Sequence, residues 1–308
     1  MSAAGWPAAV DVREVALRDG LQIEQPISTG AKIELLEAIV ATGVRRIEAT
    51  AFVSPRAVPA MADAEEVATH ALGIDGVEWS ALVASPGGAR RAVDAGLRTI
   101  EYVVSAADGH SLANVRRTTE EAVAAIDEIA ATVHGVGGRL EVIIATAWDC
   151  PFDGPTPIAR TVSVARRARE RGADQLCLGD TIGTTSPARV ITLVEAVRSV
   201  LGPVDLGAHF HNTRGTGIAS ACAALQAGVT RLDASVGGLG GCPFAPGASG
   251  NIATEELLYL LDDAGVDTGL DAAATLAAAA SAQRLLGHPL ESNLLRAGGR
   301  SRPRGRAD

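Results

Sequence analysis

Short apolar segments alternate with longer amphipathic ones along almost the whole chain. The short segments are rich in Val, Ile, Leu and Ala, and they predict eight strands, over residues 10–16, 45–51, 77–83, 99–105, 140–145, 175–178, 204–209 and 231–236. The longer segments predict a helix after each strand, over residues 31–42, 61–72, 87–95, 111–134, 156–171, 187–201, 217–227 and 253–264. Parallel strands need crossover helices that cover them, so eight strand–helix repeats indicate a (β/α)8 barrel of the α/β class.

An open, doubly wound sheet is the alternative architecture, and it would place a Gly-rich phosphate turn after the first strand. Here Leu17, Arg18, Asp19 and Gly20 follow that strand instead. We therefore predict one barrel domain over residues 1–290, with an additional Ala-rich C-terminal helix over 271–286 that packs on the barrel or on another subunit. Residues 291–308 hold five arginines among Gly, Pro and Ser, which predicts a disordered tail.

Composition narrows the classes of partner and chemistry. The formal net charge is −9 and no basic stripe precedes the tail, so nucleic acid is not an expected partner. No run of 18 apolar residues occurs, so we expect no membrane span and a cytoplasmic location. The four cysteines form no CxxC pair, which argues against a zinc ribbon or a disulfide scaffold. Lys32 is the only lysine and lies in a helical pattern, which argues against Schiff-base chemistry.

Polar residues follow or end several predicted strands, and the carboxyl ends of barrel strands share one mouth. Arg18 and Asp19 follow the first strand, Glu48 lies in the second and Asp180 follows the sixth. The Gly-rich segment 237–255, after the eighth strand, holds Cys242 and Asn251. We expect these side chains to converge on one site.

His209 and His211 end the seventh strand as a His-Phe-His motif. Residues i and i+2 of a strand point to the same face, so the two imidazoles lie side by side. With the Asp19 carboxylate and the Asn251 carbonyl oxygen they form a mixed nitrogen and oxygen donor set, which suits Mg²⁺ or Mn²⁺. The alternative is a pair of hydrogen-bonded or solvent-facing histidines without a metal.

The other strand-end residues suggest roles around that cation. Arg18 supplies a fixed positive charge for a developing oxyanion, unless it forms only a surface pair with Asp19. Glu48 and Asp180 are expected to orient Arg18 or the histidines, although Asp180 alternatively caps the helix that starts near Ser186. Cys242 is either a general acid or base on a closing loop or a small buried hydrophobe.

Five segments together closely resemble hydroxymethylglutaryl-CoA lyase, of the DRE-TIM metallolyase group. They are LRDGLQIEQ (17–25), IEATAFVSPRAVPAMAD (47–63), LGDTIGTTSP (178–187), HFHNTRG (209–215) and GGLGGCPFAPGASGNIATEEL (237–257). The resemblance implies a cation-dependent retro-Claisen cleavage of an acyl-CoA to acetyl-CoA and acetoacetate, in a homo-oligomer of two or more subunits. It also implies site roles: cation ligands Asp19, His209, His211 and Asn251; substrate contacts Arg18 and Gln22; enolate partner Arg18; loop cysteine Cys242; and acidic helpers Glu48 and Asp180.

Three departures from the family pattern concern the substrate. Gln25 replaces a lysine expected near the CoA phosphates, Ala107 and Asp108 replace a Ser-Glu pair, and Trp148 follows the fifth strand in place of a small turn. We hypothesise that the acyl group differs from hydroxymethylglutaryl-CoA and that Trp148 reshapes the pocket. A condensing enzyme of the same fold and a catalytically silent scaffold remain the alternative functions; the Cys242 loop argues against the first, and the four intact ligand positions argue against the second.

Overall fold

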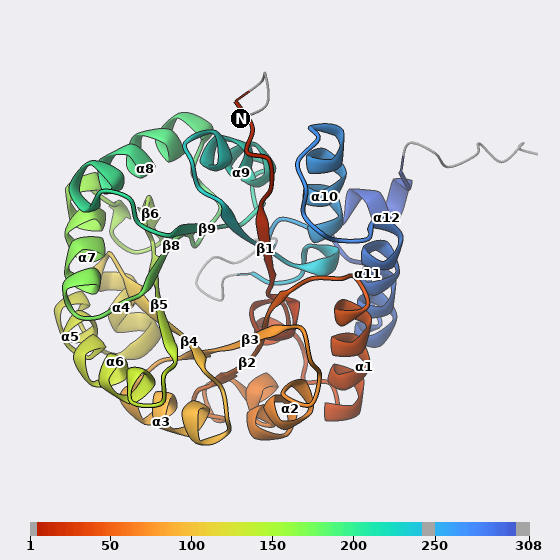
Figure 1. Cartoon of the computed structure of the whole chain (residues 1–308), viewed down its shortest axis with the longest axis horizontal. Helices are drawn as coiled ribbons and strands as arrows, with labels where there is room; N and C mark the ends of the chain where they lie inside the picture. Colours follow the sequence, from red (N-terminus) through yellow and green to blue (C-terminus); the bar gives the residue numbers. More distant parts are fainter. Residues whose placement is uncertain (1–4, 242–249, 300–308) are drawn as a thin grey trace, which may run out of the picture.

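Eight parallel strands close into a barrel in the computed structural model, which describes residues 5–241 and 250–299 (Figure 1). Strand β1 pairs with both β2 and β10, which closes the ring. The barrel strands are β1 (Asp11–Glu14), β2 (Arg46–Phe52), β3 (Glu78–Val83), β4 (Thr99–Ser105), β5 (Arg139–Ala145), β8 (Gln175–Asp180), β9 (Leu206–Phe210) and β10 (Arg231–Ala234). The predicted (β/α)8 fold is confirmed, and each predicted strand ends within two residues of the observed one.

Side chains alternate along the strands between an outward and an inward face, and charged residues occupy many of the inward positions. In β4, Tyr102 faces outward and donates a hydrogen bond to the Ala122 carbonyl of the covering helix, at 3.0 Å. Its neighbour Glu101 faces inward, where its Oε1 lies 2.8 Å from Arg13 Nη1 of β1. The barrel interior is therefore filled largely by ionic side chains, whereas apolar residues more commonly fill such barrels.

A ring of helices surrounds the strands (Figure 1). These are α1 (Thr29–Val40), α2 (Ala64–Ala71), α3 (Pro86–Asp94), α4 (Asp108–Val115), α5 (Thr119–Ala124), α6 (Ile126–His134), α7 (Ile158–Glu170), α8 (Pro187–Leu201), α9 (Gly217–Gln226) and α10 (Thr254–Asp263). The single helix predicted over 111–134 is wrong, because α4 ends at Arg116 in the left-handed conformation with φ of 57°. Helix α5 then starts at a capping box in which Thr118 and Glu121 bond reciprocally to each other's backbone.

Two further helices follow the barrel, α11 (Ala272–Leu286) and α12 (Asn293–Ala297). Helix α11 packs beside α1 and α10, and its first turn is capped by Asp271, whose side chain accepts from Ala274 N. The predicted additional C-terminal helix is therefore confirmed. The first part of the predicted tail differs from expectation because it contains α12, whereas residues 300–308 lie outside the described part of the chain.

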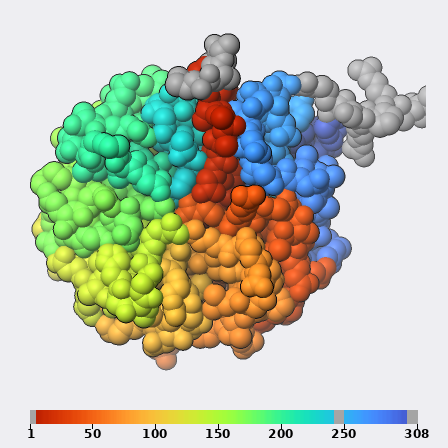
Figure 2. Space-filling view, in the orientation of Figure 1, coloured from red at the N-terminus to blue at the C-terminus, as the bar shows by residue number. Residues whose placement is uncertain are grey.

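Smaller elements complete the structure. A hairpin of β6 (Asp149–Cys150) and β7 (Gly154–Pro155), which the sequence analysis did not predict, lies between β5 and α7. The N-terminal segment lies on the surface between α9 and α10 (Figure 2), where Ala9 forms a parallel bridge with Asp267. Among the described residues, no helix is both long and apolar enough to cross a membrane.

Candidate active site

A π-helical turn, η1 (Ala16–Gly20), follows β1 and carries Arg18 and Asp19. Its wide hydrogen-bonding pattern is shown by Gly20 N, which donates to the Val15 carbonyl at 3.1 Å. Single π-helical turns often occur at functional sites, where they redirect side chains. Here the turn leaves Arg18 buried and Asp19 only partly exposed at the carboxyl end of the barrel.

Arg18 is held by carboxylates on two sides. Its Nε lies 2.7 Å from Glu48 Oε1, and its Nη1 donates to Asp19 Oδ1 at 2.6 Å. Burial raises the pKa of Glu48 well above its ordinary value, although Arg18 opposes the shift, and the neighbouring Glu101 raises it further. Burial alone would lower the pKa of Arg18, but Glu48 and Asp19 reverse that effect and the guanidinium stays charged.

Asp19, His209 and His211 form a compact cluster. One potential ligand atom from each lies within 4.8 Å of the others. Asp19 Oδ2 is 3.9 Å from His209 Nε2 and 3.6 Å from His211 Nε2, so both rings turn this nitrogen toward the carboxylate. Burial alone would raise the pKa of Asp19, but Arg18 and the two histidines outweigh it and hold the pKa well below its usual range.

Asn251 joins this cluster from the residues before α10. Its Nδ2 donates to Asp19 Oδ2 at 2.8 Å and to the Leu239 carbonyl at 2.9 Å. Its Oδ1 is buried and accepts no hydrogen bond from any described residue, and the same holds for both ring nitrogens of His211. Gly240, with φ of 117°, makes room for this amide, because a Cβ there would lie 2.5 Å from Asn251 Nδ2.

These buried, unsatisfied donor atoms fit a divalent cation. Buried polar atoms are normally paired, so their convergence beside an ionised carboxylate calls for a positive partner. Two imidazole nitrogens and two oxygens form a mixed donor set of a kind that binds divalent cations. The structure thus brings together the four predicted ligand residues, Asp19, His209, His211 and Asn251.

The remaining predicted residues lie around this cluster at different distances. Gln22 reaches Arg18 only weakly, with its Oε1 3.4 Å from Nη1.

Asp180 ends β8 and accepts from Thr184 N and Thr185 N, each at 3.1 Å. It therefore shapes the loop before α8 and does not ligate within the cluster. It is not the side-chain cap of α8 considered as the alternative, because that helix begins after Ser186. Cys242 lies outside the described residues.

Sequence analysis missed Asp233, which contacts the site directly. Asp233 Oδ2 lies 3.0 Å from His209 Nδ1, and Arg13 binds the same carboxylate through two nitrogens. The available signal was the alternation of β10, because Arg231, Asp233 and Ser235 occupy every second position of that segment. Burial alone would raise the pKa of Asp233, but Arg13 and His209 hold it well below its usual range.

Two buried glutamates fix the start of the Gly-rich segment that follows β10. Glu14 Oε1 accepts from Val236 N at 3.0 Å, and both oxygens of Glu255 lie 3.1 Å from Gly237 N. Gly237 has φ of 72°, and a Cβ there would collide with Leu290 Cδ1. The base of the segment is therefore held by β1 on one side and by α10 on the other.

Trp148 does not reshape the mouth, so that part of the substrate hypothesis is wrong. Its indole is 3% exposed and packs against Phe210, with ring centroids 5.8 Å apart, and its Nε1 donates to the Arg189 carbonyl of α8. Phe210 lies between His209 and His211 in the strand and thus faces the helices, not the interior. Trp148 and Phe210 therefore form one packing pair between the barrel and α8.

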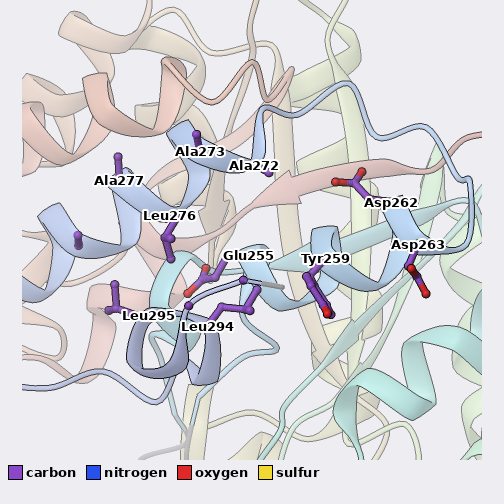
Figure 3. A pocket seen from close by; sticks show the side chains of 13 residues that line it. Glu255, Tyr259, Asp262, Asp263, Ala272, Ala273, Leu276, Ala277, Leu294 and Leu295 are labelled. Atoms are coloured by element: carbon purple, nitrogen blue, oxygen red, sulfur yellow. The ribbon is translucent and has the colours of Figure 1, made fainter. Parts of the chain in front are cut away.

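A cavity of about 1110 Å³ lies outside the barrel, between α10, α11 and α12 (Figure 3). Alanine and leucine side chains of α11 and α12 form much of its wall, and Glu255, Tyr259 and Asp262 lie along its α10 side. None of the predicted site residues lines it. The barrel mouth, not this cavity, holds the charged and ligating groups that chemistry needs.

The chain is similar to known proteins over most of its length. The profile of the HMGL-like family matches residues 9–281. The chain is 40% identical over 301 residues to (R)-citramalyl-CoA lyase of Chloroflexus aurantiacus, covering 94% of this chain and 95% of that protein. It is 36% identical over 294 residues to hydroxymethylglutaryl-CoA lyase YngG of Bacillus subtilis, covering 94% and 97%.

A solved structure gives an equally extensive match. The HMG-CoA lyase from Acinetobacter baumannii, in complex with coenzyme A and 3-methylmalate, superposes with a TM-score of 0.91 and 39% identity, covering 98% of both chains. The resemblance to hydroxymethylglutaryl-CoA lyases found in the sequence motifs is thus confirmed. The chain belongs to the HMGL-like family and is a carbon–carbon lyase.

Proposed function

We propose that this protein is a divalent-cation-dependent lyase that cleaves 3-hydroxy-3-methylglutaryl-CoA to acetyl-CoA and acetoacetate. One observation carries the proposal: a buried arginine, Arg18, lies beside a cluster of unsatisfied ligand atoms at the barrel mouth. The pairing of an anion-stabilising group with a cation site matches the needs of a C–C cleavage that develops negative charge. The match to hydroxymethylglutaryl-CoA lyase of Bacillus subtilis supports the substrate class.

The reaction is a retro-Claisen cleavage of the C2–C3 bond. A base takes the proton of the tertiary hydroxyl, the oxygen electron pair forms the new ketone, and the C2–C3 electron pair becomes the enolate of acetyl-CoA. A proton then returns to C2. When bound by Asp19, His209, His211 and Asn251, the cation supplies Lewis-acid polarisation of substrate oxygens.

Arg18 is the residue that we assign to the enolate. Its Nε lies 2.7 Å from Glu48 Oε1 and its Nη1 donates to Asp19 Oδ1, so these two side chains fix the plane of the guanidinium. The guanidinium is thus a donor for an oxyanion that is already oriented before substrate binds. We assign Cys242 the role of proton carrier, as the sequence resemblance implies.

A second substrate is favoured by the relative from Chloroflexus aurantiacus. Citramalyl-CoA has the same tertiary alcohol and methyl group as 3-hydroxy-3-methylglutaryl-CoA, but its carboxylate is one methylene shorter, so its cleavage gives pyruvate. One methylene changes transition-state binding by only about 1–3 kcal/mol in a fitted pocket. The two substrates should therefore be compared directly, by kcat/KM.

The test is a product assay on purified protein. We expect acetyl-CoA and acetoacetate from 3-hydroxy-3-methylglutaryl-CoA with Mg²⁺ or Mn²⁺, and no product with EDTA. His211→Ala should lose cation binding and turnover together, whereas His70→Ala, at a partly exposed position of α2, should retain both. Pyruvate from citramalyl-CoA at much higher kcat/KM would reassign the substrate, and full turnover in EDTA would overturn the cation dependence.

The oligomeric state and the cellular location of the protein stay predictions. A homo-oligomer would be detected by size-exclusion chromatography with light scattering. A cytoplasmic location would be checked by fractionation of the source cells.

A further inference from the structure

Asp233 lies in register between two functional neighbours. Strand pairing places it opposite Arg13 of β1 and opposite His209 of β9. Its Oδ2 is 3.0 Å from His209 Nδ1. An ionised carboxylate can only accept a hydrogen bond, so His209 must carry its proton on Nδ1. The unprotonated Nε2 then faces Asp19 in the ligand cluster.

Arg13 keeps this carboxylate ionised and fixed in orientation. Its Nε donates to Asp233 Oδ1 at 2.9 Å and its Nη2 donates to Oδ2 at 2.8 Å. Two parallel bonds define the plane of the carboxylate as well as its position. Both side chains are almost completely buried, at 3% and 5% exposure, so water does not compete for these bonds.

Arg13 is itself anchored from the opposite side of the barrel. Its Nη1 lies 2.8 Å from Glu101 Oε1 and also contacts Glu141 Oε2. Glu141 is bonded in turn by Arg231 Nη1, at 2.9 Å. The guanidinium therefore cannot turn away from Asp233 without leaving buried carboxylates unpaired, which is strongly unfavourable.

We propose that Arg13 and Asp233 form a positioning pair that fixes the tautomer and ring orientation of His209 for cation binding. This inference rests on the proposed cation-dependent function. The two Arg13 bonds alone would complete a salt bridge with only a structural role. Asp233 also accepts a third hydrogen bond, from His209 Nδ1, and this bond selects the ligating tautomer of His209. Carboxylates behind metal-bound histidines typically contribute 10- to 100-fold to metal affinity.

The first test is Mn²⁺ binding without substrate, measured by electron paramagnetic resonance on wild type and Asp233→Asn. In the variant, the amide oxygen keeps the bond from Arg13 Nε, and the NH₂ that replaces Oδ2 faces both His209 Nδ1 and Arg13 Nη2. Nδ1 must then accept a hydrogen bond, so the ring proton moves to Nε2. We expect Kd to rise 10- to 100-fold. Asp174→Asn is the matched control, because Asp174 accepts from His134 at 2.9 Å in a pair outside the barrel, and its Kd should match wild type.

The second test does not depend on how the variant folds. In EDTA-treated wild type with ¹⁵N-labelled histidine, long-range nitrogen–proton spectra at pH 8 should show His209 protonated on Nδ1, with assignment from a His209→Gln sample. Protonation on Nε2, or a wild-type Kd for folded Asp233→Asn, would overturn the positioning role alone. Failure of the wild type to bind Mn²⁺ would instead overturn the proposed cation function, and the positioning role with it.

Discussion

Glu14 gives a pH dependence of stability that can be worked out from its surroundings. Its Oε1 accepts from Ala16 N and Val236 N, both at 3.0 Å, and its Oε2 is 2.6 Å from Thr254 Oγ1. Burial raises the pKa of Glu14 from 4.5 to about 8, and these hydrogen bonds only partly oppose the shift. At neutral pH the folded chain therefore holds a neutral carboxylic acid at the joint between β10 and the Gly-rich segment.

The sign and size of the effect follow from proton linkage. Between pH 4.5 and 8 the unfolded chain has released this proton while the folded chain keeps it, so stability falls as pH rises. Each pH unit in this window costs about 1.4 kcal/mol, so the loss from pH 5.5 to 7.5 is about 3 kcal/mol. Above the folded pKa the loss is complete and the curve levels off.

Glu14→Gln is the perturbation that removes this titration. The amide oxygen can accept from both backbone N–H groups, and the amide nitrogen can donate to Thr254, so the variant mimics the protonated acid. Urea unfolding at pH 5.5, 6.5 and 7.5 should show wild type losing about 3 kcal/mol more than Glu14→Gln over this range. Glu195→Gln, at an exposed position of α8, is the control. Parallel curves for wild type and Glu14→Gln would refute the reasoning.

Three further predictions concern the site and its support. Arg18→Lys should lower kcat about 100-fold or more while Mn²⁺ affinity is retained, since the single ammonium nitrogen of lysine cannot reproduce a planar fork that contacts Glu48 and Asp19 through two separate nitrogens and aims a third at the substrate; unchanged kcat would remove Arg18 from the oxyanion role. Trp148→Ala should lower the free energy of unfolding by about 3–5 kcal/mol with KM unchanged, and a raised KM at full stability would restore the pocket role. Gly237→Ala should lower the melting temperature, and adding Leu290→Ala should recover part of the loss, whereas strictly additive losses would show that the two positions do not collide.

The sequence determined the architecture because the strand period and the helix period are both local signals. Strand and helix periods repeat eight times, and the chain closed as the repeats predicted. The His-Phe-His spacing fixed two imidazoles on one face, since successive strand residues point to opposite sides. The helix over 111–134 was overextended because the Thr118–Glu121 capping box, also a local signal, was not used.

The tertiary structure decided which distant charges meet. Asp233 and Arg13 are 220 residues apart, and Glu14 and Thr254 are 240 apart, yet both pairs form because the ring closes between β1 and β10. The register of that closure selects Asp233 as the neighbour of His209, and no spacing in the sequence encodes it. Trp148 is a residue that the sequence placed in the site and the structure removed from it. The packing of α8 against the barrel decides that its ring lies against Phe210 and not in the mouth. Local periodicity thus specified the elements, whereas closure and register specified the partners of the buried ionic groups.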